Sequence, residues 1–190
     1  MKTIEIKLFT LDELSAEAQT RVIDKNRYFN TDDNWHEDML AEYKEELAEA
    51  GFTDAVISYS GFWSQGDGLS FDAKIDIDKF CETANEKRIA KLIHNGELSN
   101  FEICKNSFSN HYSHVNTRYV ESPEVSHNTN IETIIEALYI KINDKRVELC
   151  DKFYRALEKE YDCLISDESI KQNLIANEYT YLENGTRFDE

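Results

Sequence analysis

Apolar and polar residues alternate strictly at residues 3–8 and 69–77, and this period of two predicts β-strands at residues 3–9 and 69–77. In the second segment the side chains expected to face inward are Leu69, Phe71, Ala73, Ile75 and Ile77. Three further segments combine β-branched and aromatic residues between turn residues, which also favours strands. They are residues 55–59, 101–108 and 112–120.

Elsewhere the apolar residues recur every three or four positions, and this period predicts helices with one buried side. A first helix is predicted to start at Thr10, and others cover residues 35–50, 78–94, 131–164 and 166–176. The buried side of the first helix would be Leu11, Leu14, Ala18 and Val22. That of the helix at residues 131–164 would be Ile131, Ile135, Leu138, Ile142, Leu149, Phe153 and Leu157. Thr10 and Glu13 form a predicted capping box, and Ser166 can cap the last helix. Asn184 and Gly185 favour a small terminal hairpin.

These elements predict an α+β fold, a mostly antiparallel sheet of four or five strands with helices on one face and a C-terminal helical arm. We expect residues 1–122 to form the α+β core. Residues 123–190 would add the long helix, the short helix and the hairpin, packed on the core as one domain. A chain of 190 residues has the length of a single domain with at most a small addition.

Acidic residues are in large excess, with 38 Asp and Glu against 21 Lys and Arg and a formal net charge of -17. This charge repels phosphate backbones, so we expect no direct contact with nucleic acid. It favours a protein partner with a basic surface, including the basic groove of a protein that handles nucleic acid.

The chain has neither the apolar run of a signal peptide near its start nor a stretch of about 20 apolar residues that could span a membrane. We therefore expect a cytoplasmic protein of a host bacterial cell, with no membrane contact. The four cysteines, Cys81, Cys104, Cys150 and Cys163, form no close pair, so neither a zinc ribbon nor a redox dithiol is predicted.

One side of the predicted helix at residues 35–50 is acidic. It carries Asp38, Glu42, Glu45 and Glu49, which span about 16 Å at the usual helical rise. A run of charge is usually a solvated helix face. The alternative is a partner-binding face that imitates the charge of duplex DNA, and such a face would need help from Asp72 and Asp76 on the sheet.

A glycine-rich segment from Ser60 to Gly68 joins two predicted strands. It lacks the Gly-Lys-Ser/Thr ending of a phosphate-binding loop, and Asp67 would repel a phosphate. One interpretation is a hairpin whose glycines adopt positive φ while Phe62 or Trp63 packs on the sheet. The other is a recognition tip at which Phe62, Trp63, Gln65 and Asp67 contact a partner.

Two pairs of residues suggest metal binding by type alone. His111 and His114 would point to opposite faces of a strand and could converge only on a turn. Asp76 and Asp78 lie on one side of a predicted strand end and could hold magnesium. Neither pair has a further ligand marked out by its spacing, and no metal or other cofactor is predicted.

Three segments together resemble a family of small phage and prophage proteins. They are FTLDELS at residues 9–15, SGFWSQGDGLSF at residues 60–71, and SDES at 166–169 followed by ANEY at 176–179. Some members of that family are labelled antitoxins of toxin–antitoxin stability systems, and no catalytic residue is established for it. The resemblance implies a phage origin. This chain departs from the family at residues 163–165, where Cys-Leu-Ile replaces more polar or aromatic residues.

The net negative charge, the resemblance to phage proteins and the absence of residues at a catalytic spacing favour a non-catalytic, phage-encoded accessory protein. It would bind and inhibit a host defence protein that handles nucleic acid, such as a CRISPR or restriction effector. One alternative is an antitoxin that neutralises a basic toxin by protein–protein contact. Another is a small metal-dependent hydrolase that uses Asp76 and Asp78.

Overall fold

The structure, a computed structural model of the chain, describes residues 2–31, 34–84, 101–105, 113–122 and 129–188, with only the backbone of residues 105 and 129–131. The chain forms two compact units. The sheet unit is His36–Glu158, and the terminal unit combines Met1–Trp35 with Lys159–Glu190. These bounds differ from the division between residues 122 and 123 that the sequence suggested.

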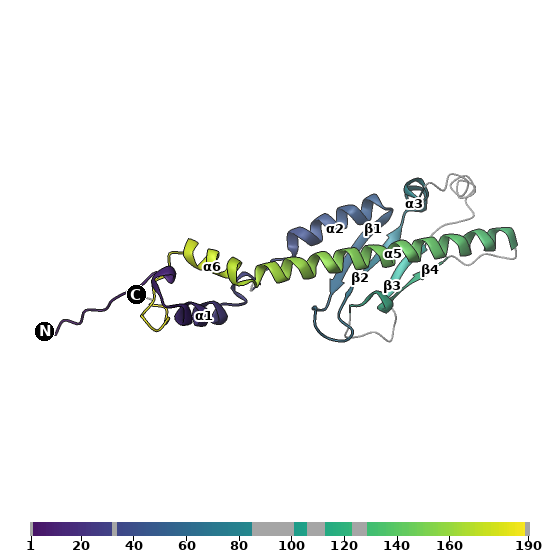
Figure 1. The fold of residues 1–190 in the computed structure, drawn as a ribbon. Helices are drawn as coiled ribbons and strands as arrows, with labels where there is room; N and C mark the ends of the chain where they lie inside the picture. The colour runs from purple at the N-terminus through teal and green to yellow at the C-terminus, as the bar shows by residue number, and fades with distance from the viewer. Residues whose placement is uncertain (1, 32–33, 85–100, 106–112, 123–128, 189–190) are drawn as a thin grey trace. The chain divides into compact units, whose positions relative to one another are not determined.

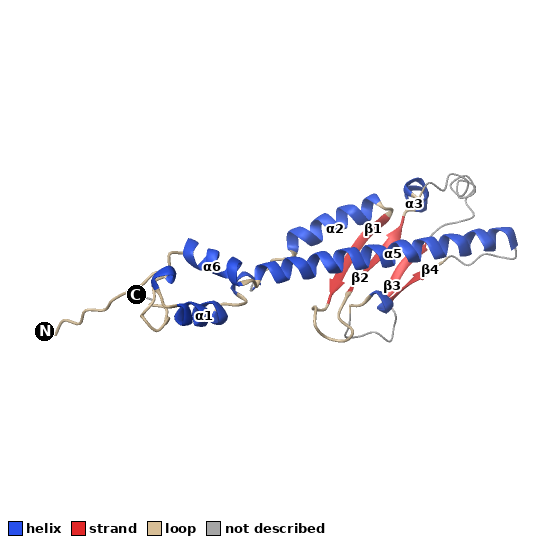
Figure 2. Ribbon diagram, viewed as in Figure 1, coloured by secondary structure: helices blue, strands red, loops and turns tan. Residues whose placement is uncertain are grey.

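A four-stranded antiparallel sheet, with the strands in the order β1-β2-β3-β4, is the frame of the sheet unit (Figure 2). The strands are β1 (Phe52–Tyr59), β2 (Leu69–Ile75), β3 (Phe101–Lys105) and β4 (Arg118–Glu121). Each strand pairs with the next one along the chain. The predicted α+β fold with a mostly antiparallel sheet is therefore confirmed.

Strand β2 shows both the strength and the limit of the alternating pattern. Its predicted inward residues Leu69, Phe71, Ala73 and Ile75 are buried, and Ser70 is buried as well. The strand ends at Ile75 because Asp76 caps a helix, α3 (Ile77–Thr83). Ile77 thus begins a helix, and its prediction as a strand residue was wrong. Residues 85–94 of the predicted helix lie outside the described residues.

The last strand, β4, is shorter than predicted. β3 covers all of the described part of the predicted segment 101–108, which ends at residue 105. Of the predicted segment 112–120, Val115–Thr117 form a 3-10 helix, η3, and the strand begins at Arg118. The ring of His114 accepts a hydrogen bond from the amide of Asn116, which starts this turn in place of a strand. Residues 106–112 lie outside the described residues.

Two helices, α2 (Glu37–Glu49) and α5 (Thr129–Leu164), pack on the sheet (Figure 1). α2 contacts β1, and Cys150 of α5 contacts the backbone of Phe71 in β2. The two helices meet where the Tyr43 ring stacks on the Phe153 ring, with 4.2 Å between centroids. The predicted apolar side of α5 is buried at Ile135, Leu138, Ile142, Leu149, Phe153 and Leu157, while the side chain of Ile131 lies outside the described part of the chain.

The terminal unit has a core of its own. Its helices are α1 (Ala16–Lys25) and α6 (Asp167–Ala176), with a 3-10 turn η1 (Leu11–Glu13) before α1 and another, η2 (Phe29–Thr31), after it. The predicted stripe is buried, and it packs with residues from the C-terminal part of the chain. This core consists of Leu11, Leu14, Ala18, Val22, Ile23, Ile170, Leu174 and Tyr181.

Two predictions for the first 25 residues were wrong. The segment 3–9 forms no strand in this chain, because only Phe9 makes a bridge, to Tyr181, and the apolar side chains before it are exposed. The capping box of Thr10 and Glu13 is present, but it opens η1 instead of an α-helix. Leu14 is extended, and the helix α1 begins only after Ser15, whose side chain accepts from the amide of Ala18.

The predicted terminal hairpin is reduced to a tight turn. The amide of Leu182 donates to the carbonyl of Thr186 at 2.8 Å, and Gly185 has a φ of +85°. A single bridge joins Tyr181 to Arg187, so no strand forms on either side of the turn.

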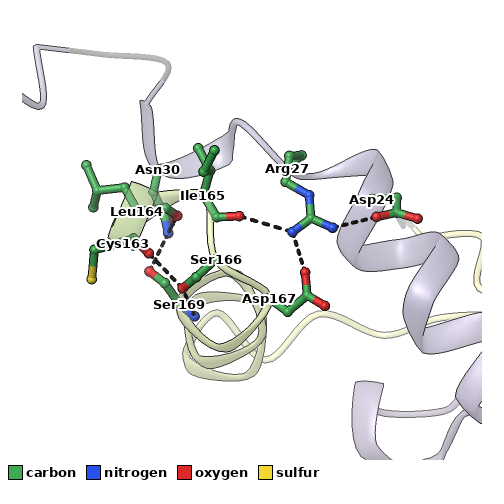
Figure 3. A network of polar contacts seen from close by, with 9 residues as sticks. All are labelled: Asp24, Arg27, Asn30, Cys163, Leu164, Ile165, Ser166, Asp167 and Ser169. Carbon is green, nitrogen blue, oxygen red and sulfur yellow. Dashed lines mark hydrogen bonds and ion pairs between the residues drawn. The ribbon is translucent and has the colours of Figure 1, made fainter. Parts of the chain in front are cut away.

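Figure 3 shows how Arg27 and Asn30 hold the junction between α5 and α6. Arg27 pairs with Asp24 and Asp167, and one of its N–H groups donates to the carbonyl of Ile165 at 3.0 Å. Asn30 donates to the carbonyl of Leu164 and to the hydroxyl of Ser169, both at 3.0 Å. Carbonyls at the end of a helix have no partner within it, so these two side chains satisfy groups that the turn leaves open.

Candidate partner-binding surface

The exposed side of α2 carries four carboxylates on one face. Asp38, Glu42, Glu45 and Glu49 are all exposed, as the sequence predicted, while Tyr43 and Leu47 are buried on the opposite side. No described basic side chain forms an ion pair with any of the four. We call these four residues the acidic face of α2.

A fifth carboxylate of this helix has a partner. Lys152 of α5 lies 2.5 Å and 2.6 Å from the two carboxylate oxygens of Glu46. Glu46 therefore fastens α2 to α5 and contributes less charge to the surface than its neighbours do.

The glycine-rich loop between β1 and β2 is organised by Asp67. One oxygen of its carboxylate accepts hydrogen bonds from the amides of Trp63 at 3.0 Å and Ser64 at 2.7 Å. Gly61 and Gly66 adopt φ of +90° and +100°, a conformation that other residues rarely reach. Asp67 thus has a structural role within the loop, and its contact with a partner stays a prediction.

Phe62 and Trp63 point to different surroundings. The Phe62 ring packs against Tyr59, at 5.9 Å between centroids, and against Tyr154 of α5, at 5.5 Å. Trp63 is 68% exposed, and Gln65 beside it is exposed too. The packed ring of Phe62 agrees with the hairpin interpretation, and a contact of the exposed Trp63 with a partner stays a prediction.

Two contacts from distant parts of the chain support this loop. The Tyr154 hydroxyl donates to the carbonyl of Gly61 at 3.0 Å, and burial raises the pKa of that hydroxyl. The Tyr59 hydroxyl lies 3.2 Å from a ring nitrogen of His36, at the start of α2. The loop and the first turn of α2 are thereby joined through His36, Tyr59 and Phe62. Sequence reasoning missed Tyr154 and His36, because no local pattern marks contacts between residues that are 93 and 23 positions apart.

The base of the loop is closely packed. A Cβ at Gly68 would lie 2.9 Å from the ring of His114, so only glycine fits there without a shift. The amide of Ser113 donates to the hydroxyl of Ser60 at 3.3 Å. His114 is thus part of the packing around the loop, and His111, its suggested partner for a metal, lies outside the described residues.

Asp72 and Asp76 do not join the acidic face of α2. Asp72 pairs with Arg118, with 2.6 Å between carboxylate oxygen and Nε, and the Arg118 side chain is only 5% exposed. Asp76 caps α3 by accepting from the amide of Lys79 at 3.1 Å, and Asp78 lies in the first turn of that helix. The described residues contain no group of three His, Cys, Asp or Glu side chains placed to hold a metal ion.

A family model described as a domain of unknown function, DUF8835, matches residues 35–167, a range that contains the acidic face of α2 and the glycine-rich loop. No curated protein and no solved structure matches the chain. Among the described helices, none combines the length and hydrophobicity that crossing a membrane requires. Because the matched range covers well over half of the sequence, the chain belongs to the DUF8835 family.

Proposed function

We propose that this chain is a phage-encoded accessory protein that binds a basic host protein and inhibits it without catalysis. The partner would be a defence protein that handles nucleic acid, such as a CRISPR or restriction effector. The observation that carries the proposal is the acidic face of α2, where four exposed carboxylates have no described basic partner. The segments at residues 9–15 and 60–71, which resemble phage proteins, support the proposal that the chain is phage-encoded.

The charge density of α2 indicates what this face can and cannot do alone. Over about 16 Å, duplex DNA presents roughly ten phosphate charges. The acidic face offers four. Its attraction to a nucleic-acid channel would therefore raise the rate of association more than it raises the affinity of the complex. An uncharged contact is needed beside it.

Trp63 is suited to supply that contact. It is exposed, yet its backbone is fixed by Asp67 and its neighbour Phe62 is packed against Tyr154. A large aromatic side chain on a fixed loop loses little conformational freedom on binding, which is typical of the residues that dominate interfaces. Gln65, exposed on the same loop, can add a polar contact.

The test is a plating assay in bacteria that carry an active CRISPR or restriction system. Cells that express the wild-type chain should restore plating of a phage that the system blocks. Replacing Asp38, Glu42, Glu45 and Glu49 with lysine should remove this effect, since the attraction becomes repulsion.

A matched variant separates this face from charge in general. Four exposed carboxylates of α5, Glu136, Asp151, Glu160 and Asp162, can be replaced with lysine to give the same change in net charge. This variant should keep the plating effect, provided that circular dichroism shows both variants folded. Loss of activity in both variants, or in neither, contradicts the proposal. An antitoxin would instead relieve growth arrest by a co-expressed toxin and leave plating unchanged.

A further inference from the structure

The segment 3–8 has the pattern of a strand but lacks a partner strand. Ile4, Ile6 and Leu8 are 81%, 53% and 42% exposed. Residues 3–8 form no backbone hydrogen bond with any other described residue. An extended, alternating segment with open backbone groups is a template for pairing with another strand.

The pairing at Phe9 determines which edge of this segment lies away from Tyr181, and we call this the open edge. The amide of Phe9 donates to the carbonyl of Tyr181, and the amide of Tyr181 donates to the carbonyl of Phe9, both at 2.8 Å. Along a strand, the backbone groups of successive residues point to opposite edges. If the strand continues toward the N-terminus, the odd residues face the Tyr181 side and Ile4, Ile6 and Leu8 direct their backbone groups to the other edge.

We propose that this open edge pairs with the same segment of a second copy of the chain, antiparallel and with the two-fold axis at Ile6. In this register Ile6 lies opposite Ile6 and Ile4 lies opposite Leu8 of the second copy. Glu5 then lies opposite Lys7 in both halves of the pair. All apolar side chains share one face, and both charged pairs are attractive.

The neighbouring registers are excluded by the same residues. A shift by one residue places apolar side chains opposite polar ones. A shift by two places either Glu5 opposite Glu5 or Lys7 opposite Lys7, which is destabilising. The sequence of the segment therefore selects one register.

The backbone geometry fits this register as well. The residues that pair through hydrogen bonds would be Ile4, Ile6 and Leu8, whose backbone groups face the open edge. Glu5 and Lys7 would form the non-hydrogen-bonded pairs, in which side chains lie closest. A two-stranded ribbon alone is only marginally stable, but this one would continue through Phe9 to Tyr181 and Arg187 in each copy.

This inference concerns assembly and is independent of the proposed inhibition. The experiment is sedimentation equilibrium of the full chain at moderate salt, over micromolar to hundreds of micromolar concentration. The wild-type chain should dimerise. Glu5→Lys and Lys7→Glu should each weaken dimerisation by about tenfold, since two symmetric attractive pairs become repulsive.

Two further samples identify the register. An equimolar mixture of Glu5→Lys and Lys7→Glu should form a heterodimer of wild-type affinity, because residues 5 and 7 are again of opposite charge in both pairs. The double variant E5K/K7E should form a homodimer of wild-type affinity. Circular dichroism should be the same for all variants, since both side chains are exposed. A monomeric wild-type chain, dimers insensitive to the reversals, or single variants that do not recover on mixing would each overturn the proposal.

Discussion

Adjacent aromatic residues of the glycine-rich loop have different surroundings, and the difference can be measured. Phe62 lies between Tyr59 and Tyr154, while Trp63 is largely exposed. Removing a packed ring leaves a cavity or a collapsed loop, whereas removing an exposed ring changes the folded state little. A substitution of Phe62 should therefore mainly lower the free energy of unfolding, whereas a substitution of Trp63 should mainly lower the affinity for the partner.

Trp63→Ala should reduce partner binding by about 2 kcal/mol or more while changing the free energy of unfolding by less than about 0.5 kcal/mol. Phe62→Ala should lower the free energy of unfolding by roughly 1–3 kcal/mol, less than a fully buried ring because Phe62 is only half-buried. Urea denaturation measures the free energy of unfolding, and the plating assay reports weaker partner binding as a loss of plating. A destabilised Trp63→Ala with normal activity would show that Trp63 serves the fold.

At the scale of elements, the start of α6 depends on side chains from a segment that precedes the sheet unit in the sequence. Arg27 and Asn30 reach the carbonyls of Leu164 and Ile165, and Ser166 caps the helix through the amide of Ser169. These bonds bring together residues more than 130 positions apart in the chain. The short helix α6 thus relies on tertiary contacts as well as on its own cap.

Arg27→Ala should destabilise the terminal unit by about 1–2 kcal/mol, because it removes a hydrogen bond to a helix-end carbonyl and two partly exposed ion pairs. Hydrogen exchange should become faster in α6 and stay unchanged in β2. The matched control is Lys25→Ala, which removes the same charge from an exposed position of α1. Equal effects of the two substitutions would mean that charge, and not the junction, is responsible.

Periodicity correctly predicted those helices and strands in which the spacing of apolar residues alone determines which side is buried. The inward residues of β2 and the buried side of α5 lie where the pattern placed them. The pattern failed where residues outside the segment determine its conformation. Segment 3–9 makes a single bridge, between Phe9 and Tyr181, and Ile77 is helical because Asp76 caps α3.

The candidate site was predictable to the same extent. The acidic face of α2 follows from helical spacing alone, and it is exposed as expected. The roles of Asp67 and Asp72 depend on the loop amides and on Arg118, which no spacing rule identifies. The support of the loop by Tyr154 comes from a helix far along the sequence.

At the scale of the whole molecule, a net charge of -17 acts against compaction. Few ion pairs among the described residues offset it, and most of these are partly or largely exposed. Repulsion among exposed charges is screened within about 8–10 Å at physiological ionic strength. Salt should therefore stabilise this chain, although it weakens each exposed ion pair.

The melting temperature should rise by several degrees between about 10 mM and 150 mM NaCl, as screening reduces the repulsion among carboxylates. Differential scanning calorimetry measures this shift. The lysine variants of α2 and of α5 both reduce the net charge, so each should respond less to salt than the wild-type chain does. A melting temperature that falls with salt would mean that the ion pairs outweigh the repulsion.

The terminal unit joins residues that precede the sheet unit to residues that follow it. During synthesis on the ribosome, the early half of this core has to wait until the chain beyond Lys159 has emerged, whereas the sheet unit in between can fold sooner. The early half of this core therefore lacks its packing partners Ile170 and Leu174 for most of translation. It consists of Leu11, Leu14, Ala18 and Val22. We expect the nascent chain to recruit a ribosome-bound chaperone at this stage.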